Sequence, residues 1–200
     1  MNKAFWENRI QNRADLVTRV THLTRGETED AAFDRLWRIL LDKRIRASNE
    51  KGINAGGAMV CCFQEIPLYS IAENLQFEEA TGACNRRYSA FGIRVLKGQF
   101  FQRGGRPVIY VDKELKDRLP KQFVWEMVSM DLNDPESIVD WSHEREWRIH
   151  NDYVFDYADI EIIVSTPTYY RKLIEKCLAE GHEDIIKSCN GITVMNSVYN

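Results

Sequence analysis

The chain has 200 residues, which is enough for one domain with a sizeable hydrophobic core. Hydrophobic residues make up 44% and charged residues 28%, as in globular proteins, and no apolar run is long enough to cross a bilayer. The net charge of −3 excludes a globally basic nucleic-acid-binding protein, so contact with nucleic acid would need a local basic patch.

The N-terminal stretch and the cysteines bear on location. Residues 1–15 are charged and amphipathic and lack the apolar core of a signal peptide. The five cysteines are an odd number, Cys61 and Cys62 are adjacent, and no Cys-x-x-Cys occurs. We therefore expect reduced thiols in a cytoplasmic protein without a membrane segment, and no metal site, because no Cys/His pair has the spacing of zinc ligands.

The first half of the chain predicts helices alternating with strands. Thr28 is a good N-cap for a helix whose apolar residues keep helical spacing, and Pro67 fits the first turn of the next helix. The predicted elements, in order, are a helix at 3–13, a strand within 15–25, a helix at 29–43, a loop at 49–57, a strand at 58–63 and a helix at 68–79.

Strands predominate in the second half. The predicted elements are strands at 88–96 and 107–111, a helical segment at 112–128 broken at Pro120, strands at 144–150 and 159–165, a helix at 169–180 capped by Thr168, and a strand within 191–196. No regular βαβ alternation, Gly-rich dinucleotide fingerprint or P-loop occurs. We expect one α+β domain over 1–200, with 1–14 as an N-terminal helical extension.

The stretch WSHEREWRI, residues 141–149, combines charge with a strand-like pattern. On a strand, Arg145, Trp147 and Ile149 share one face, and Glu144, Glu146 and Arg148 share the other. Burying the second face unpaired would be costly, so it must be solvated, paired or part of a site. A solvated ladder is the simpler interpretation; a cleft in which Arg148 assists Glu146 is the functional one.

Three other polar stretches lie next to predicted strands. They are THLTR with His22, FQEIP with Gln64 and Glu65, and NRRYSAF with Tyr88. Taken alone, each has a structural explanation: a core histidine, an ordinary strand-to-helix turn, and core aromatics with a charged lead-in.

Taken in order, these segments resemble DarT-type ADP-ribosyltransferases, which modify nucleic-acid bases. The resemblance rests on THLT, a YxxFxI strand, PVIYV, and a late Glu–aromatic strand followed by IEIIV, over roughly residues 16–176. The CFQEIPL and HEREWR segments are similar to AbiGi-like phage-defence proteins. The resemblance implies a split, strongly bent β-sheet with flanking helices that holds NAD as substrate in its cleft, without a metal.

Carried over residue by residue, the resemblance implies that His22, Thr24, Tyr88 and Gln64 bind NAD and that Glu146 is catalytic. Glu144, two residues earlier, is the fallback. The cleft arginine is Arg46, Arg86 or Arg87, and the last two are also candidates for contacting the acceptor. This sequence departs from the family at Ser89, Ala90 and Gly92, where the DarT strand has bulkier residues.

Cleavage of the nicotinamide–ribose bond passes through an oxocarbenium-like state, which a carboxylate holding the ribose 2′-hydroxyl stabilises. Removing Glu146 is then expected to cost activity and little stability.

The implied function is an anti-phage toxin that ADP-ribosylates a base of RNA or single-stranded DNA, paired with a cognate antitoxin protein. A protein acceptor stays open. Two alternatives also stay open: a non-catalytic binding module or antitoxin, and a nuclease holding Mg²⁺ through its acidic residues, which are Asp131, Asp134, Asp140, Glu144 and Glu146.

Overall fold

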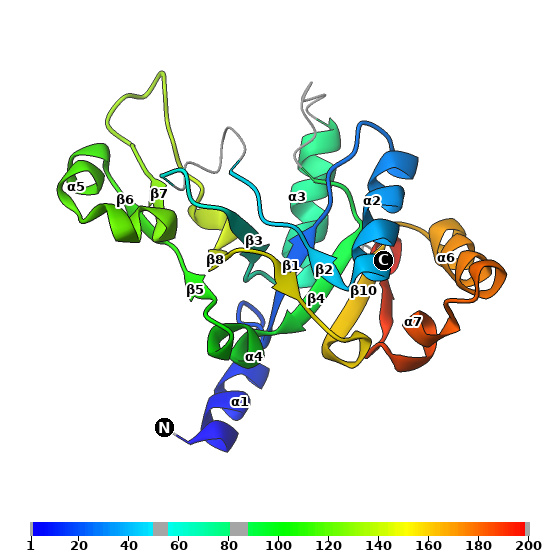
Figure 1. The fold of residues 1–200 in the computed structure, drawn as a ribbon. Helices are drawn as coiled ribbons and strands as arrows, with labels where there is room; N and C mark the ends of the chain where they lie inside the picture. Colours follow the sequence, from blue (N-terminus) through cyan, green and yellow to red (C-terminus); the bar gives the residue numbers. More distant parts are fainter. Residues whose placement is uncertain (1, 50–55, 81–87, 199–200) are drawn as a thin grey trace.

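A computed structural model describes residues 2–49, 56–80 and 88–198. Its described part contains a seven-stranded mixed sheet with flanking helices, in agreement with the expected α+β class (Figure 1). The strand order is β11-β10-β4-β1-β3-β8-β5. The strands of this sheet are β1 Arg19–Leu23, β3 Val60–Gln64, β4 Gly92–Leu96, β5 Arg106–Pro107, β8 Glu146–His150, β10 Ile160–Val164 and β11 Ile192–Val194.

The α-helices begin at residues that can cap them. Thr28 accepts a hydrogen bond from the backbone N–H of Ala31, as predicted, and Thr166 does the same for Tyr169. The prediction that Thr168 caps the later helix was wrong, because Pro167 already occupies its first turn. The helices are α1 Lys3–Gln11, α2 Glu29–Asp42, α3 Leu68–Ala80, α4 Lys97–Gln102, α5 Lys113–Arg118, α6 Pro167–Glu180 and α7 Glu183–Ser188.

The large sheet consists of two halves that meet at one point. Strand β1 pairs with β4 at five successive positions, and β3 pairs with β8 at five. Between β1 and β3, the only paired positions in the described residues are Thr21 and Gln64. The two halves therefore diverge from this pair, which opens space beside β1 and β3.

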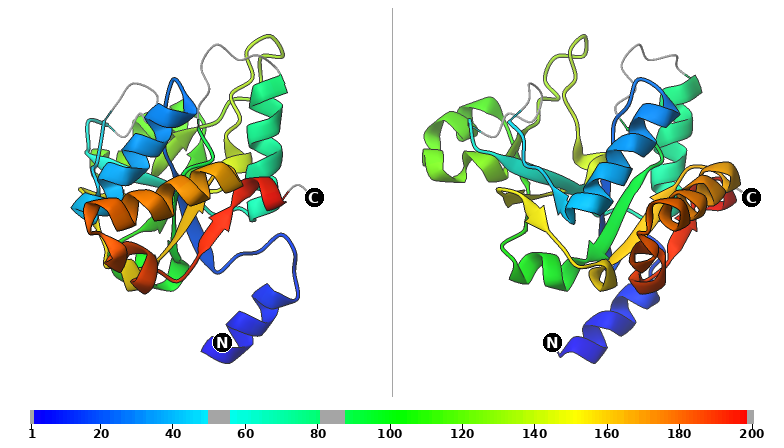
Figure 2. Two further views of the ribbon diagram at one scale, coloured as in Figure 1. Left: turned by 90° about the vertical axis from the view of Figure 1, so that its right-hand side faces the viewer. Right: turned by 45° about the vertical axis from the view of Figure 1, so that its right-hand side comes forward.

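Hydrophobic residues cover both faces of the half that contains β1, β4, β10 and β11. Ile160, Ile162 and Val164 of β10 join the main core with residues of α2, α6 and α7. Ile163, on the opposite face of β10, packs in a smaller core with Ile71 of α3. Figure 2 shows α2 and α6 on one side of the sheet and α3 on the other. Packing on both faces of this half thus supports β1.

A lobe built from residues 106–139 lies beside β8. The predicted strand at 107–111 is split: β5 pairs with β8, whereas β6 (Ile109–Val111) pairs with β7 (Met127–Ser129). The predicted helix at 112–128 ends at Arg118, because Pro120 interrupts it, and a 3-10 helix over Lys121–Glu126 and then β7 follow. A further two-stranded sheet joins β2 (Arg44–Ile45) to β9 (Tyr153–Val154).

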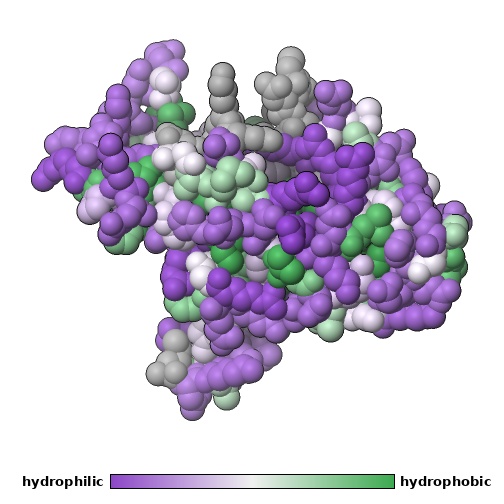
Figure 3. Space-filling model, in the orientation of Figure 1, coloured by the Kyte–Doolittle hydropathy of each residue, from purple (hydrophilic) through white to green (hydrophobic). Residues whose placement is uncertain are grey.

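Helix α1 projects from the rest of the molecule, and the Lys97 ammonium lies 5.6 Å from the ring centre of Trp6 on this helix. Figure 3 shows the same face of the molecule as mostly hydrophilic, with hydrophobic residues in small separate patches. Among the described residues, no helix is both long and apolar enough to cross a bilayer.

Candidate functional site

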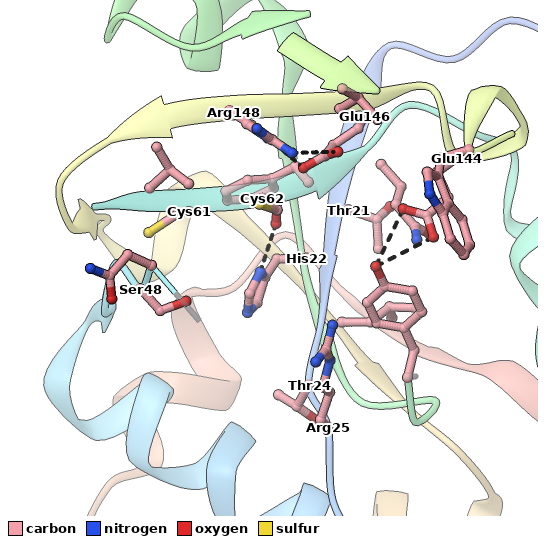
Figure 4. Close-up of a pocket in the computed structure, with 18 of the residues that line it drawn as sticks. Thr21, His22, Thr24, Arg25, Ser48, Cys61, Cys62, Glu144, Glu146 and Arg148 are labelled. Carbon is pink, nitrogen blue, oxygen red and sulfur yellow. Dashed lines mark hydrogen bonds and ion pairs between the residues drawn. The ribbon is translucent and has the colours of Figure 1, made fainter. Parts of the chain in front are cut away.

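A cavity of about 940 Å³ opens where the two halves of the sheet diverge. Strands β1, β3 and β8 supply much of its lining, and α2 and the lobe supply other walls (Figure 4). Seven residues expected from the sequence line it: His22, Thr24, Arg46, Gln64, Tyr88, Glu144 and Glu146. They come from five separate segments, so the fold has brought together groups that are far apart in the chain. Arg86 and Arg87 lie outside the described residues.

The His22 side chain extends from β1 toward β3. Its Nδ1 is 2.9 Å from the carbonyl oxygen of Cys62, and its ring packs against Phe63. Burial, followed by the nearby charge of Arg25, lowers the pKa of His22 below its usual value of 6.5. The ring is therefore neutral at pH 7, and because a carbonyl only accepts, Nδ1 carries the proton and Nε2 is left as an acceptor. Such an acceptor suits a hydroxyl or amide donor of a ligand.

Glu146 opens β8 beside Gln64, its partner in the sheet register. Arg148 grips its carboxylate with two hydrogen bonds, Nε to Oε1 at 2.7 Å and Nη2 to Oε2 at 3.2 Å. Arg148 also donates to the carbonyls of Trp125 and Met127 and is only 3% exposed. The expected alternation holds for this strand, since Trp147 and Ile149 are in the core and Glu146 and Arg148 face the cavity.

The pairing of Glu146 changes one expectation. Its side chain is 11% exposed and compensates a buried guanidinium. Removing one partner of such a pair leaves an uncompensated charge in the interior. Glu146 therefore supports the fold as well as the cavity, and on this geometry its removal is expected to cost stability in addition to activity.

The prediction placed Glu144 on the strand, on the same face as Glu146 and Arg148. In the structure Glu144 precedes the strand. It ends a 3-10 helix over Ser142–Glu144, and Arg145 takes left-handed backbone angles (φ 43°, ψ 55°) before β8 begins. This turn sends the Arg145 side chain to the carbonyl oxygen of Asp15, away from the core face. Glu144 is buried, and the hydroxyl of Tyr88 lies 3.3 Å from its Oε2. Two carboxylates therefore reach the cavity from different backbone geometries.

Tyr88 and Thr24 lie outside the regular strands, and hydrogen bonds to backbone groups fix the segments that carry them. The predicted strand at 88–96 begins only at Gly92, so Tyr88 precedes it. Ser89 N–H donates to the Thr24 carbonyl, and the Thr24 hydroxyl lies 3.1 Å and 3.2 Å from the carbonyls of Ala32 and Phe91. The hydroxyl hydrogen of Thr24 is thus used within the protein, which leaves only its oxygen lone pairs for a ligand.

Gly92 lies where strands β4 and β1 approach each other closely. A Cβ at this position would lie 1.9 Å from the carbonyl oxygen of His22. Strands β4 and β1 therefore approach closely at His22 only because residue 92 has no side chain.

Sequence reasoning missed several lining residues, among them Thr21, Arg25, Arg35, Cys62, Lys116 and Trp141. The Thr21 hydroxyl is buried and has no hydrogen-bond partner among the described residues. Arg25 lies over the Tyr88 ring, 5.6 Å from its centre. Thr21 could have been found, because it flanks His22 in THLTR; the contributions of α2 and the lobe have no signal in the sequence.

The described residues that line the cavity carry a net positive charge, whereas the whole chain is negative. Five cationic side chains and two carboxylates line the cavity, although the whole chain has a net charge of −3. The cations are Arg25, Arg35, Arg46, Lys116 and Arg148. Arg46 is at the solvent-facing edge, with its side chain 80% exposed and paired to Asp42. A surplus of cations in one cavity favours a ligand that carries phosphate groups.

Cys62 faces the same cavity from β3. Burial, and then the negative charge of Glu146, raise its pKa well above the usual value for a thiol. The group is therefore a protonated thiol at neutral pH and a poor nucleophile.

The acidic residues of the nuclease hypothesis are not gathered at one place. Only Glu144 and Glu146 of the five line the cavity. Within residues 2–49, 56–80 and 88–198, no three histidine, cysteine or acidic side chains are arranged to hold a metal ion.

Comparisons of the chain with models of protein families, with curated proteins and with solved structures found no significant match.

Proposed function

We propose that the chain is a mono-ADP-ribosyltransferase that transfers ADP-ribose from NAD to a base of RNA or single-stranded DNA, acting as an anti-phage toxin with a cognate antitoxin. The observation that carries the proposal is the gathering of His22, Gln64, Tyr88 and both glutamates around one cavity. The divergence of the sheet beside Thr21 and Gln64 supports the ADP-ribosyltransferase-like fold that the sequence resembles.

The cavity suits a dinucleotide in size and charge. Its volume of about 940 Å³ lies in the range of small-molecule sites. Its cation surplus favours the pyrophosphate, for which Arg25 and Arg35 are the candidates on the β1 and α2 side. The buried, unpartnered hydroxyl of Thr21 and Nε2 of the half-buried His22 offer a ligand two polar atoms.

The reacting end of NAD would lie between Tyr88 and the carboxylates. The Tyr88 ring supports the nicotinamide, and Glu146 or Glu144 accepts a hydrogen bond from the ribose 2′-hydroxyl and faces the developing cation. The bond between C1′ and the nicotinamide nitrogen breaks, and nicotinamide leaves with the electron pair. A nitrogen of the acceptor base then bonds to C1′ and loses its proton to solvent.

The acceptor half of the proposal rests on Trp141. This residue lines the cavity and is 38% exposed, which suits stacking by a single-stranded base. Lys116, on the lobe side of the same cavity, supplies a positive charge for the backbone of the acceptor.

The test is incubation of purified protein with labelled NAD and separate pools of RNA, single-stranded DNA and cell protein. Glu146→Gln and Glu144→Gln are each compared with the natural chain, with circular dichroism to check folding. If the natural chain transfers label to RNA or DNA and one of these variants does not, the proposal is supported. The inactive variant then identifies the catalytic carboxylate. Label in the protein pool keeps the transferase and changes the acceptor.

The result that contradicts the proposal is a folded natural protein that neither binds nor consumes NAD. The non-catalytic module then becomes the better explanation, with Glu146 serving only to pair Arg148. Cleavage of nucleic acid that needs Mg²⁺ and not NAD supports the nuclease instead.

A further inference from the structure

A second cavity, of about 620 Å³, lies in the lobe next to the first. The two share four lining residues, Gly56, Lys116, Ser129 and Val139. The second cavity thus continues the first on the side of α5, the 3-10 helix and β7.

The second cavity combines an apolar surface with cations. Its apolar residues are Leu119, Val124, Met130 and Val139. Its charged residues are Lys113, Lys116, Lys121, Asp117 and Asp131. Neither Lys113 nor Lys121 forms an ion pair with a described residue, so both ammonium groups are available to a ligand.

Lys116 links the two cavities electrostatically. It is half-buried, and its Nζ is 3.5 Å from the Ser129 hydroxyl. Burial, and then the charge of Arg148, lower the pKa of its ammonium group. Arg148 is already paired with Glu146, so a phosphate in the second cavity would be stabilised by Lys116 itself.

We infer that the second cavity is a subsite for a nucleotide next to the modified base in single-stranded nucleic acid, with its phosphate on Lys113, Lys116 and Lys121 and its base against the apolar residues. The inference rests on the proposed function and deepens it, because it assigns a place to the strand beyond the reacting base. A mononucleotide acceptor would not need this second cavity; a polymer would use it at every binding event.

The test compares Lys113→Gln/Lys121→Gln with a control, Lys3→Gln/Lys187→Gln. Both variants lose two positive charges, but Lys3 and Lys187 lie on α1 and α7, outside both cavities. Lys116 stays unchanged because it also lines the NAD cavity. Fluorescence anisotropy measures the binding of single-stranded DNA and of RNA of the same sequence over a range of salt concentrations, and calorimetry measures NAD binding.

The expected result is weaker oligonucleotide binding by the cavity variant, with a slope of log Kd against log salt that is less steep by about 1.4, as for two lost phosphate contacts. The control keeps the natural slope, and NAD binds both variants equally. The DNA and RNA arms show which polymer occupies the subsite. If the cavity variant binds both DNA and RNA more weakly, the subsite recognises the phosphate groups that the two polymers share.

Equal slopes for the natural protein and the cavity variant overturn the inference, as does a natural protein that binds neither oligonucleotide. If label still transfers from NAD in either case, the proposed transferase survives without this subsite. If the slope falls as expected but NAD does not bind, the subsite stands and the proposed transferase fails.

Discussion

The Tyr88 hydroxyl lies 3.3 Å from Oε2 of Glu144, although 56 positions of the chain separate the two residues. Tyr88 comes from the segment before β4, and Glu144 from the turn before β8. The same ring carries Arg25 at 5.6 Å. An aromatic ring, a carboxylate and a guanidinium thus meet on the wall of the cavity proposed to bind NAD.

Replacing Tyr88 by Phe is expected to weaken NAD binding by up to about tenfold, because Glu144 loses the hydrogen bond, worth about 0.5–1.5 kcal/mol, that orients its carboxylate at the cavity wall. The ring, and its contact with Arg25, would remain. Calorimetric titration with NAD measures the affinity. The matched control is Tyr69→Phe, which removes the hydroxyl that donates to the Ala14 carbonyl outside the cavity. Equal affinities of both variants would show that the Tyr88 hydroxyl has no part in binding.

Replacing Glu146 by Ala is expected to lower the free energy of unfolding by about 3–5 kcal/mol, because Arg148 would be left buried and unbalanced. Glu146→Gln, which keeps an acceptor for Arg148, should cost less. Urea denaturation measures both. Glu114→Ala is the control, because Glu114 pairs with Arg118 on an exposed surface. A loss no larger than that of the control would mean that solvent reaches Arg148 freely.

His22 is expected to titrate below pH 6.5 in NMR spectra of the folded protein, because burial disfavours its charged form. Between its folded pKa and 6.5 the unfolded chain binds more protons, so stability falls as the pH drops through this window. His22→Asn, which keeps an N–H for the Cys62 carbonyl, should reduce this pH dependence. A midpoint at or above 6.5 would contradict the burial of the ring.

NAD binding should weaken as the pH falls through the folded pKa of His22, below the window just described, because protonation there converts Nε2 from an acceptor to a donor. Calorimetry at a series of pH values follows the effect. In His22→Asn the affinity should be low at every pH and should lack this transition. A transition that persists in the variant would have to come from another group.

Replacing Gly92 by Ala is expected to destabilise the protein, because the new Cβ would meet the His22 carbonyl oxygen at 1.9 Å and force β4 away from β1. Thermal unfolding measures the effect. Gly98→Ala is the matched control, because its Cβ would have no heavy atom within 4 Å and lies in helix α4, where Ala is favoured by about 0.5–1 kcal/mol. The midpoint of thermal unfolding is expected to fall in Gly92→Ala and to rise in Gly98→Ala. An unchanged midpoint in Gly92→Ala would show that the strands can separate.

The sequence by itself determined the elements whose signals are local. The β-branched residues before THLTR predict β1, Thr28 and the apolar spacing after it predict α2, and Trp147 alternating with Glu146 and Arg148 predicts β8. These signals depend on side-chain periodicity and on hydrogen bonds within a few residues, so they can be read without knowing the partners. The seven expected residues that line the cavity came from the resemblance and not from these periodic signals.

Only the tertiary structure decided which of these residues meet, and in which state. The single pairing of Thr21 with Gln64 sets the place where the sheet opens, and it depends on strands 43 positions apart. The bidentate grip of Arg148 on Glu146 and the removal of Glu144 from its strand depend on a lobe and a left-handed turn at Arg145. Long-range contacts and desolvation decide such features, and neither leaves a periodic trace in the sequence.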